Sequence, residues 1–467
     1  MQRVTKFPSG PKQPPLFQWI HWIRNPLGFL DECGARYGHK FTVRFPGLLP
    51  MVWFAEPSAA EFMFATGREN FEARAGTAGN VFSAFVGAGS LLMMVGSRHR
   101  QERRLVDPLF HGQRLSSYDG FNDEIIDRAI DDLPIRRPFA LYPVLEEIAT
   151  NINIRGLGIT DDEQCAHLRN LLFQYLSTLK PSPTRRIAAA AGLAISRPNV
   201  KRKLVGLKTE IYATLGQEIK RCREQVTEGR GDFVAKLVAA RTEDSQTASE
   251  AEAKVCDQIL TFLMAGHSTT ATSLSWTLAH ILGHRDIERC VQQELREVFG
   301  DEPAHSERTA ELKYLDAVIK ESLRLHPSFL LVTRRVLKET SLCGYELPVG
   351  TPVAIVTYLL HRRPDLWDNP GEFRPERFLG SRPSPFEYCP FGGGHRTCTG
   401  NAFAMNTSRA VLARLLSRAK LRIPLGVAFR PKLWEPFVPP QGGLPVIVDE
   451  VVRAGPRQGL SPLANVS

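Results

Sequence analysis

The sequence lacks the cysteine patterns that organise a disulfide scaffold or a zinc module. It has eight cysteines at irregular spacing and no CxxC pair. Scattered cysteines of this kind are typical of a protein kept in a reducing compartment, so we expect a cytoplasmic protein with free thiols. With 43% hydrophobic and 23% charged residues over 467 positions, the chain also falls outside the disordered and collagen-like classes.

A recognisable secretory signal or membrane anchor is also missing. Residues 1–19 are basic and rich in proline, without an apolar run. Residues 259–282 contain no Asp, Glu, Lys or Arg, and a segment of this length can cross a bilayer. However, eight of them are Ser or Thr and two are His, which makes transfer to hydrocarbon costly. We expect no membrane span but a helix through the centre of the protein, beside a site that uses its hydroxyls.

Long runs of one charge are absent too. The formal net charge is +10, yet no stretch contains five consecutive basic residues. The sequence therefore does not indicate nucleic-acid binding. A docking face for an acidic partner and an ordinary solvated basic surface both remain open.

Hydrophobic periodicity predicts a mainly helical protein with a small β-sheet. Residues 40–56 alternate around a Pro-Gly turn, as paired strands do. From about residue 97 to residue 335, apolar residues recur at steps of three and four, which is the helical period. Strand character returns at 340–357, and 362–397 form a meander rich in proline and arginine. No repeat or low-complexity linker divides the chain, so we expect one unit.

The stretch FGGGHRTCTG, residues 391–400, carries the clearest chemical signal. Taken alone, Cys398 would be expected to be an inert thiol. Its three preceding glycines let the backbone approach a flat ligand and expose amides that can donate to sulfur. Gly400 opens a helical pattern, and the positive end of a helix lowers the pKa of a thiol. We therefore expect a thiolate that is a good ligand for iron.

This stretch resembles the ligand loop of the cytochrome P-450 family of haem-thiolate enzymes. The fixed places of that loop are filled by Phe391, Gly394, Arg396, Cys398 and Gly400. The resemblance implies Cys398 as the axial thiolate of iron, Phe391 as packing that tunes its electron density, and Arg396 as a partner of a haem propionate.

A second match is Glu321-Ser-Leu-Arg324, which taken alone would be an ordinary surface pair. Together with Arg377 it resembles the Glu-Arg-Arg triad of the family. The resemblance implies a structural role, in which the triad holds the meander against the core behind the haem.

A third match is Ala265-Gly-His-Ser-Thr269 in the uncharged helix. Ala265 and Gly266 are small enough to leave room for a diatomic ligand, and the Thr269 hydroxyl can bond to bound dioxygen. The alternative is a core helix whose hydroxyls bond back to its own carbonyls. The family usually has Asp or Glu where this chain has Ser268, which puts acid-assisted proton delivery in doubt.

A fourth match is the segment that contains His99 and Arg103, which resembles the family's helix toward the propionates. Without a haem it would be a solvated charged helix. Either Arg334 or Arg335 is expected to supply another propionate contact, because anionic groups need cations where water is scarce. Counting back from Gly344 favours Arg334.

The four matches follow family order, so the resemblance covers nearly the whole chain. It implies one soluble, bacterial-type cytochrome P-450 domain over 1–467, with a β-rich part at about 1–95 and a helical haem-binding part at about 96–467. It also implies haem b as cofactor and dioxygen as co-substrate. We expect no flavin or iron–sulfur domain after the last strands, and electrons from a ferredoxin or flavodoxin with its reductase.

Five phenylalanines are expected to line the substrate pocket, although each taken singly fits a plain core equally well. They are Phe82, Phe85, Phe262, Phe329 and Phe437. Together they point to a hydrophobic substrate of terpenoid, steroid or fatty-acid type. The main hypothesis is therefore a monooxygenase that hydroxylates or epoxidises such a molecule. Two alternatives stay open: a peroxide-driven or isomerising haem-thiolate enzyme, and a non-catalytic haem carrier or gas sensor.

Overall fold

A small β-sheet at one end of the molecule joins two distant parts of the sequence. The computed structural model describes residues 7–73, 85–110, 119–179, 198–224, 233–242, 247–431 and 437–452. Its strands are β1 (Lys40–Val43), β2 (Met51–Phe54), β3 (Phe71–Glu72), β4 (Pro138–Ala140), β5 (Leu331–Val336), β6 (Thr340–Leu342), β7 (Tyr345–Leu347), β8 (Pro352–Val356), β9 (Ala419–Arg422) and β10 (Pro445–Val451).

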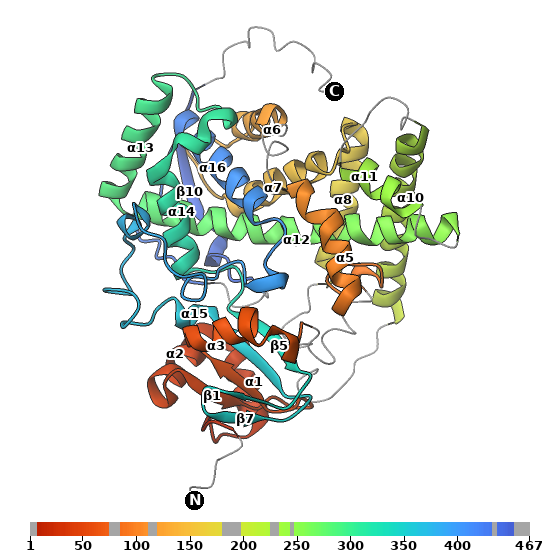
Figure 1. Cartoon of the computed structure of the whole chain (residues 1–467). Helices are drawn as coiled ribbons and strands as arrows, with labels where there is room; N and C mark the ends of the chain where they lie inside the picture. The colour runs from red at the N-terminus through yellow and green to blue at the C-terminus, as the bar shows by residue number, and fades with distance from the viewer. Residues whose placement is uncertain are drawn as a thin grey trace, which may run out of the picture.

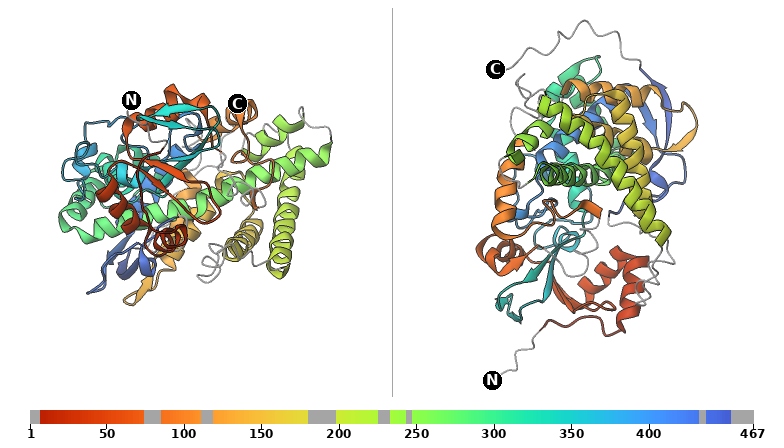
Figure 2. Two further views of the ribbon diagram at one scale, coloured as in Figure 1. Left: turned by 90° about the horizontal axis from the view of Figure 1, so that it is seen from below. Right: turned by 90° about the vertical axis from the view of Figure 1, so that its right-hand side faces the viewer.

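The largest sheet has the order β1-β2-β8-β5-β3. Strands β1 and β2 pair antiparallel with Phe41 opposite Trp53, which confirms the strand pair expected at 40–56. Strand β2 then pairs parallel with β8, so residues near position 53 lie beside residues near 354. Figure 2 shows these early and late strands side by side in both views.

Beside this sheet, a smaller sheet β4-β10-β9 and the pair β6-β7, most of the described fold is helical, as the periodicity predicted. They are α1 (Pro15–Arg24), α2 (Pro26–Tyr37), α3 (Pro57–Glu61), α5 (Gly96–Val106), α6 (Asp119–Asp131), α7 (Tyr142–Gly156), α8 (Asp162–Leu179), α10 (Pro198–Glu224), α11 (Phe233–Thr242), α12 (Ala248–Gly283), α13 (Arg285–Phe299), α14 (Lys313–Leu325), α15 (Thr357–Leu360) and α16 (Asn401–Arg418).

The 36-residue helix α12 crosses the helical part of the molecule (Figure 1). It begins at Thr247, whose hydroxyl accepts a hydrogen bond from the Glu250 amide at 3.2 Å and caps the helix. Its first half packs into one hydrophobic cluster with α8, α10 and α11, and its second half into another with α7, α14 and α16. The uncharged segment 259–282 is therefore the buried central helix that the sequence predicted. No helix within the described ranges is long and apolar enough to cross a membrane.

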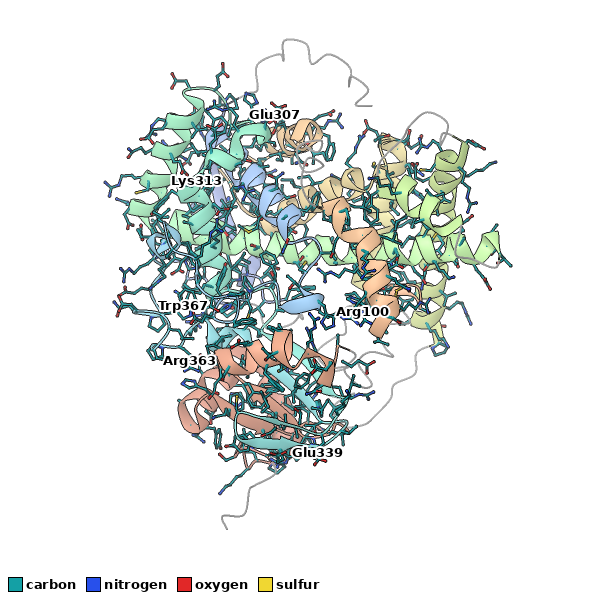
Figure 3. The ribbon with its side chains drawn as sticks, viewed as in Figure 1. Arg100, Glu307, Lys313, Glu339, Arg363 and Trp367 are labelled. Carbon is teal, nitrogen blue, oxygen red and sulfur yellow. The ribbon has the colours of Figure 1, made fainter. Side chains whose placement is uncertain are left out.

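Glu321 on α14 holds the meander through two arginines. Arg324 donates to both oxygens of the Glu321 carboxylate at 2.7 and 2.8 Å, and Arg377 donates to one of them at 3.1 Å. Arg324 also donates to the carbonyls of His361, Pro370 and Glu372, and its guanidinium lies over the ring of Trp367, which Figure 3 labels. The structure thus brings the expected triad together at the junction between α14 and residues 361–377.

Candidate functional site

Glycines at 393 and 394 let the Cys398 loop lie directly against the segment Phe62–Thr66. A Cβ atom at Gly394 would lie 2.0 Å from the carbonyl oxygen of Phe64, and one at Gly393 would lie 2.2 Å from its ring. Gly394 also has a φ of 66°, a conformation that other residues rarely adopt. The Cys398 amide donates to the Phe391 carbonyl at 2.9 Å and closes the loop. Larger residues in this loop would move Cys398.

Cys398 directly precedes the turn into α16. Its side chain has accessible surface, yet desolvation is the largest effect on its pKa. Both observations hold for a thiol that faces a space inside the protein. Burial raises the pKa of Cys398, and the hydrogen bond from the Gly400 amide opposes that shift. The lowered pKa that the sequence predicted is therefore wrong for the protein alone, because desolvation outweighs the helix end. A coordinated metal ion would supply the charge that deprotonates the thiol.

Three basic side chains gather beside the loop, and none of them forms an ion pair with a described carboxylate. Arg334 is 6% exposed; its guanidinium donates to the Thr333 carbonyl at 2.9 Å and makes no ion pair with a described residue. Arg396 donates to the carbonyls of Leu91 and Met94, while its Nε atom has no partner within the described structure. Burial lowers the pKa of each guanidinium to about 10.

His99 completes this group from α5. Its ring lies 6.0 Å from that of His395, and its Nδ1 atom is buried with no partner in the described part of the chain. Burial and then Arg396 lower the pKa of His99 to about 3. Buried cations and an orphaned ring nitrogen are the environment that carboxylates such as haem propionates would satisfy.

Arg103 and Arg335 are arranged differently from these three. Arg103 pairs with Asp107 at 2.7 Å and donates to the His395 carbonyl at 3.0 Å. In the structure Arg103 joins α5 to the loop, and its expected contact with a haem propionate stays a prediction. Arg335 pairs with Glu72 at 3.7 Å nearer the surface, so Arg334 is the arginine that points into the site.

Helix α12 opens an otherwise buried face at Ala265, Gly266 and Thr269. Ala265 is exposed, and the other two are half-buried. A Cβ atom at Gly266 would lie 2.6 Å from the amide nitrogen of Asn153 on α7, so glycine is needed for helix packing. The Thr269 hydroxyl donates to the Ala265 carbonyl at 2.6 Å. This is the bond to the helix's own carbonyl that a plain core helix would also make. The Thr269 oxygen can still accept a hydrogen bond from a ligand.

Two expected pocket residues, Phe329 and Phe437, meet near this opening. Their rings contact edge to face with centroids 5.1 Å apart, and Phe329 is 46% exposed. The neighbouring Ser328 hydroxyl donates to the Thr269 carbonyl at 3.3 Å, which ties this loop to α12. These two rings therefore fit a place in the pocket.

The other expected pocket residues are placed differently. Phe262 is a core residue, because its ring packs 5.0 Å from both Phe110 and Phe233. Phe85 is half-buried, and its carbonyl accepts a hydrogen bond from Tyr175 at 2.9 Å. Phe82 lies outside the described residues.

Sequence reasoning missed two polar side chains of α7 that contact α12. Asn153 donates to the Phe262 carbonyl at 2.8 Å, and Glu146 accepts a hydrogen bond from the Ser268 hydroxyl at 3.1 Å. Each residue lies more than a hundred positions from the α12 residue that it contacts, so no local spacing could have connected them.

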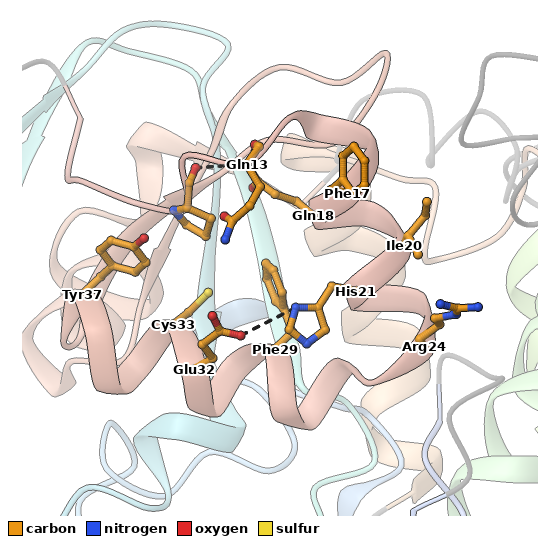
Figure 4. Close-up of a pocket in the computed structure, with 11 residues that line it drawn as sticks. Gln13, Phe17, Gln18, Ile20, His21, Arg24, Phe29, Glu32, Cys33 and Tyr37 are labelled. Carbon is orange, nitrogen blue, oxygen red and sulfur yellow. Dashed lines mark hydrogen bonds and ion pairs between the residues drawn. The ribbon is translucent and has the colours of Figure 1, made fainter.

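A surface pocket elsewhere does not belong to this site. It has a volume of about 360 Å³ and is lined only by residues between 11 and 37, with His21 and Glu32 paired at 3.7 Å (Figure 4).

Comparison with known proteins agrees with this geometry. The family model of cytochrome P450 matches residues 8–444. The chain belongs to the cytochrome P450 family. Putative cytochrome P450 135B1 of Mycobacterium tuberculosis is 33% identical over 447 residues, which are 93% of this chain and 90% of that protein. Putative cytochrome P450 135A1 of the same organism is 29% identical over 422 residues, 89% of each chain.

A solved structure shares the P450 fold. Retinoic acid bound cyanobacterial CYP120A1 superposes with a TM-score of 0.80 at 25% identity, over 96% of this chain and all of that one. The expected family and fold class are thereby confirmed, as is the assignment to oxidoreductases of the monooxygenase type. Cytochrome P450 enzymes hold haem and use dioxygen, and the donor set around Cys398 fits that group.

Proposed function

We propose that this cytochrome P450 hydroxylates or epoxidises a hydrophobic small molecule with electrons from a separate ferredoxin or flavodoxin and its reductase. The observation that carries the proposal is the placement of Cys398 beside three basic groups, the buried His99 and Arg334 and the half-buried Arg396, none of which forms an ion pair within the described part of the chain. A thiolate ligand and cations for propionates are what a haem-thiolate site requires.

Haem b would be held by residues from both sides of this loop. Cys398 would be the axial ligand, Phe391 would pack beside its sulfur, and Arg334, Arg396 and His99 would meet the propionates. The sequence has no CxxCH motif, which fits a haem bound without covalent thioether links. When bound, the haem supplies the activation of dioxygen; the protein supplies binding, orientation and protons.

The substrate proposed is of terpenoid, steroid or fatty-acid type. Ala265 leaves an opening on α12, and the rings of Phe329 and Phe437 form an apolar wall beside it. Apolar walls with few polar groups suit ligands of this kind. The structural neighbour with retinoic acid bound adds support, because retinoic acid is a terpenoid with a long apolar chain that ends in a carboxylate.

A library of such molecules tests this proposal. Ligands that displace water from the ferric haem change its absorption spectrum, so we expect terpenoids, steroids or fatty acids to give saturable shifts. Small polar molecules of matched size serve as the control. Shifts with polar molecules alone would contradict the proposed substrate class.

The redox partner is proposed to dock on α5. Arg98, Arg100 and Arg104 are exposed on this helix, and Figure 3 labels Arg100. Arg103 ties the same helix to the loop before Cys398, so the exposed arginines lie on the side of the ligand cysteine. An acidic ferredoxin or flavodoxin bound there would have a short path for electrons.

The peroxide-driven alternative rested on Ser268 in place of an acid. In the structure an acid does lie next to Ser268, because Glu146 of α7 is 3.1 Å from its hydroxyl. The observation that motivated this alternative therefore no longer favours it.

A further inference from the structure

Ser268 differs from three other hydroxyls of α12 in where its proton is directed. Thr269, Ser275 and Thr277 each donate to the carbonyl four residues earlier in the helix, while Thr261 bonds to the Asp257 carbonyl and to the Ser90 hydroxyl. Ser268 is only 6% exposed, and its hydroxyl donates to Oε1 of Glu146 on α7 and not to a carbonyl of its own helix. A buried hydroxyl bonded to a carboxyl group has a route for a proton that the other hydroxyls do not have.

His267 adds a third group to the same corner. Its Nδ1 atom lies 2.6 Å from the Ser268 hydroxyl and 3.7 Å from Oε1 of Glu146. Phe173 of α8 packs edge to face on the imidazole ring at 5.3 Å and fixes its orientation. A hydroxyl that is hydrogen-bonded to His267 and also donates to Glu146 is held in one geometry by both partners.

The packing of α7 on α12 fixes Glu146 at this place. Glu146, Thr150 and Asn153 follow one another at steps of four and three, so they lie on one face of α7. Thr150 donates to the Glu146 carbonyl at 2.6 Å, and Asn153 donates to α12 at the Phe262 carbonyl. Because Gly266 brings the two helices together at Asn153, the register that places Glu146 beside Ser268 cannot slide.

We propose that Glu146 takes the place of the acid that α12 lacks and delivers protons through the Ser268 hydroxyl to the neighbourhood of Thr269. This proposal rests on the proposed monooxygenase function and assigns the source of its protons. Glu146 acts through Ser268 and does not itself touch the haem or the substrate, so it is a positioning residue that holds a proton.

The proton balance of this relay is closed. The Ser268 hydroxyl first turns from Glu146 toward Thr269, which reverses the hydrogen bond seen in the structure. Protonated Glu146 then gives its proton to the Ser268 oxygen while Ser268 releases its own hydroxyl proton toward Thr269, so Ser268 is chemically unchanged after each transfer. The carboxylate left behind regains a proton from water, which it can reach because its side chain is 15% exposed. No electron moves in these steps, and one proton passes from solvent to the site.

Glu147 provides a matched control one position along α7. Its side chain is 49% exposed and pairs with Arg169 of α8 at 2.8 Å, so it points away from α12. Glu147→Gln makes the same chemical change as Glu146→Gln and removes only a surface ion pair, which contributes little to stability.

The test compares product formed per electron consumed in the holoenzyme. We expect Glu146→Gln and Ser268→Ala each to lower this ratio about tenfold, less than the effect of a direct general acid because water partly substitutes. The double variant should show no further loss, since both changes break one route. Glu147→Gln should behave as the wild type.

A rescue variant separates a proton function from a merely structural one. Adding Ser268→Asp to Glu146→Gln moves the acid from α7 to α12, and we expect it to restore at least half of the lost ratio. In the infrared spectrum, a carboxyl band that titrates and shifts in D2O should disappear in Glu146→Gln and persist in Glu147→Gln.

Unchanged product per electron in both Glu146→Gln and Ser268→Ala would overturn the proposal, as would additive losses without rescue. If Glu146→Gln does not fold, Ser268→Ala alone decides between these outcomes, because it removes one oxygen atom. Each variant is first shown to keep the reduced carbonyl absorption of the wild type, so a failure here leaves the assignment of Cys398 and the monooxygenase function standing.

Discussion

The Glu321 carboxylate lies where water does not reach it, yet it accepts hydrogen bonds from Arg324, Arg377 and the Arg374 amide. The motif made this cluster predictable, because Glu321 and Arg324 share a helix face and Arg377 stands in a matching segment. The carbonyl partners at His361, Pro370 and Glu372 were not predictable, since they depend on how the meander folds back on α14.

Glu321→Ala is expected to lower the free energy of unfolding by about 3–5 kcal/mol, because it leaves the charges of Arg324 and Arg377 without the carboxylate that balances them. The protein should be recovered in low yield and poor in haem. Denaturant unfolding and the ratio of haem to protein absorbance measure both effects. Glu311→Ala is the control, since Glu311 pairs with Arg308 on the surface. A Glu321→Ala protein of normal yield and stability would refute the structural role.

At the scale of single elements, the sequence predicted the helix α12 well but not its contacts with the neighbouring helices. The absence of charge over 259–282 and its many hydroxyls indicated a central helix, and the structure has one. The contact between Ser268 and Glu146 spans 122 positions of sequence, and a register between packed helices leaves no local pattern. The placement of Phe262 in the pocket stays a prediction for a related reason: helical spacing does not tell which apolar face meets another helix, and its ring packs against Phe110 and Phe233.

Helix α5 carries a prediction about electron transfer. Changing Arg100 and Arg104 to Glu should slow reduction by an acidic ferredoxin or flavodoxin, and the wild-type rate should fall steeply as salt shortens the Debye length below about 8 Å. Stopped-flow reduction at several ionic strengths measures both. Arg285→Glu with Arg289→Glu on α13 makes the same charge change on exposed arginines elsewhere and should leave the rate unchanged. A reduction rate that changes neither with salt nor with the charge reversal on α5 would mean that the donor docks on another face.

At the scale of the whole molecule, buried histidines couple stability to pH. His280 stacks on Phe373 at 3.9 Å, and the Nε2 atom of His361 accepts a hydrogen bond from the Cys389 amide at 3.0 Å. Burial lowers the pKa of both from 6.5 to about 3. Between these values the unfolded chain binds protons that the folded protein excludes, so stability falls as the pH falls below about 6.5.

Each of these histidines contributes up to about 1.4 kcal/mol per pH unit in that window. Urea unfolding at pH 7 and pH 5 should therefore show a lower midpoint at pH 5. His280→Gln should reduce the difference between the two midpoints, whereas His167→Gln, at an exposed position of α8, should leave it unchanged. Equal midpoints at pH 7 and pH 5 in the wild type would contradict this coupling.

The arrangement of the whole chain explains why four short motifs sufficed to predict its architecture but not its substrate. Residues 393–394 must be glycine because Phe64 lies against them, and His99, Arg334 and Arg396 converge from three distant segments on one place. Such backbone and charge requirements restrict the residue types at these positions, so they can be recognised in the sequence. The wall formed by Phe329 and Phe437 requires only apolar side chains, as any core does. The sequence therefore does not identify the ligand.

The absorption spectrum of the reduced carbonyl complex tests the central claim, that Cys398 is the thiolate ligand of a bound haem. The account predicts a Soret band at about 450 nm for the wild type and its loss, together with loss of activity, in Cys398→Ser. Cys290→Ser, at an exposed cysteine of α13, should keep the wild-type spectrum. A band at about 420 nm in folded, active wild-type protein, or a Cys398→Ser variant that keeps both band and turnover, would contradict the claim.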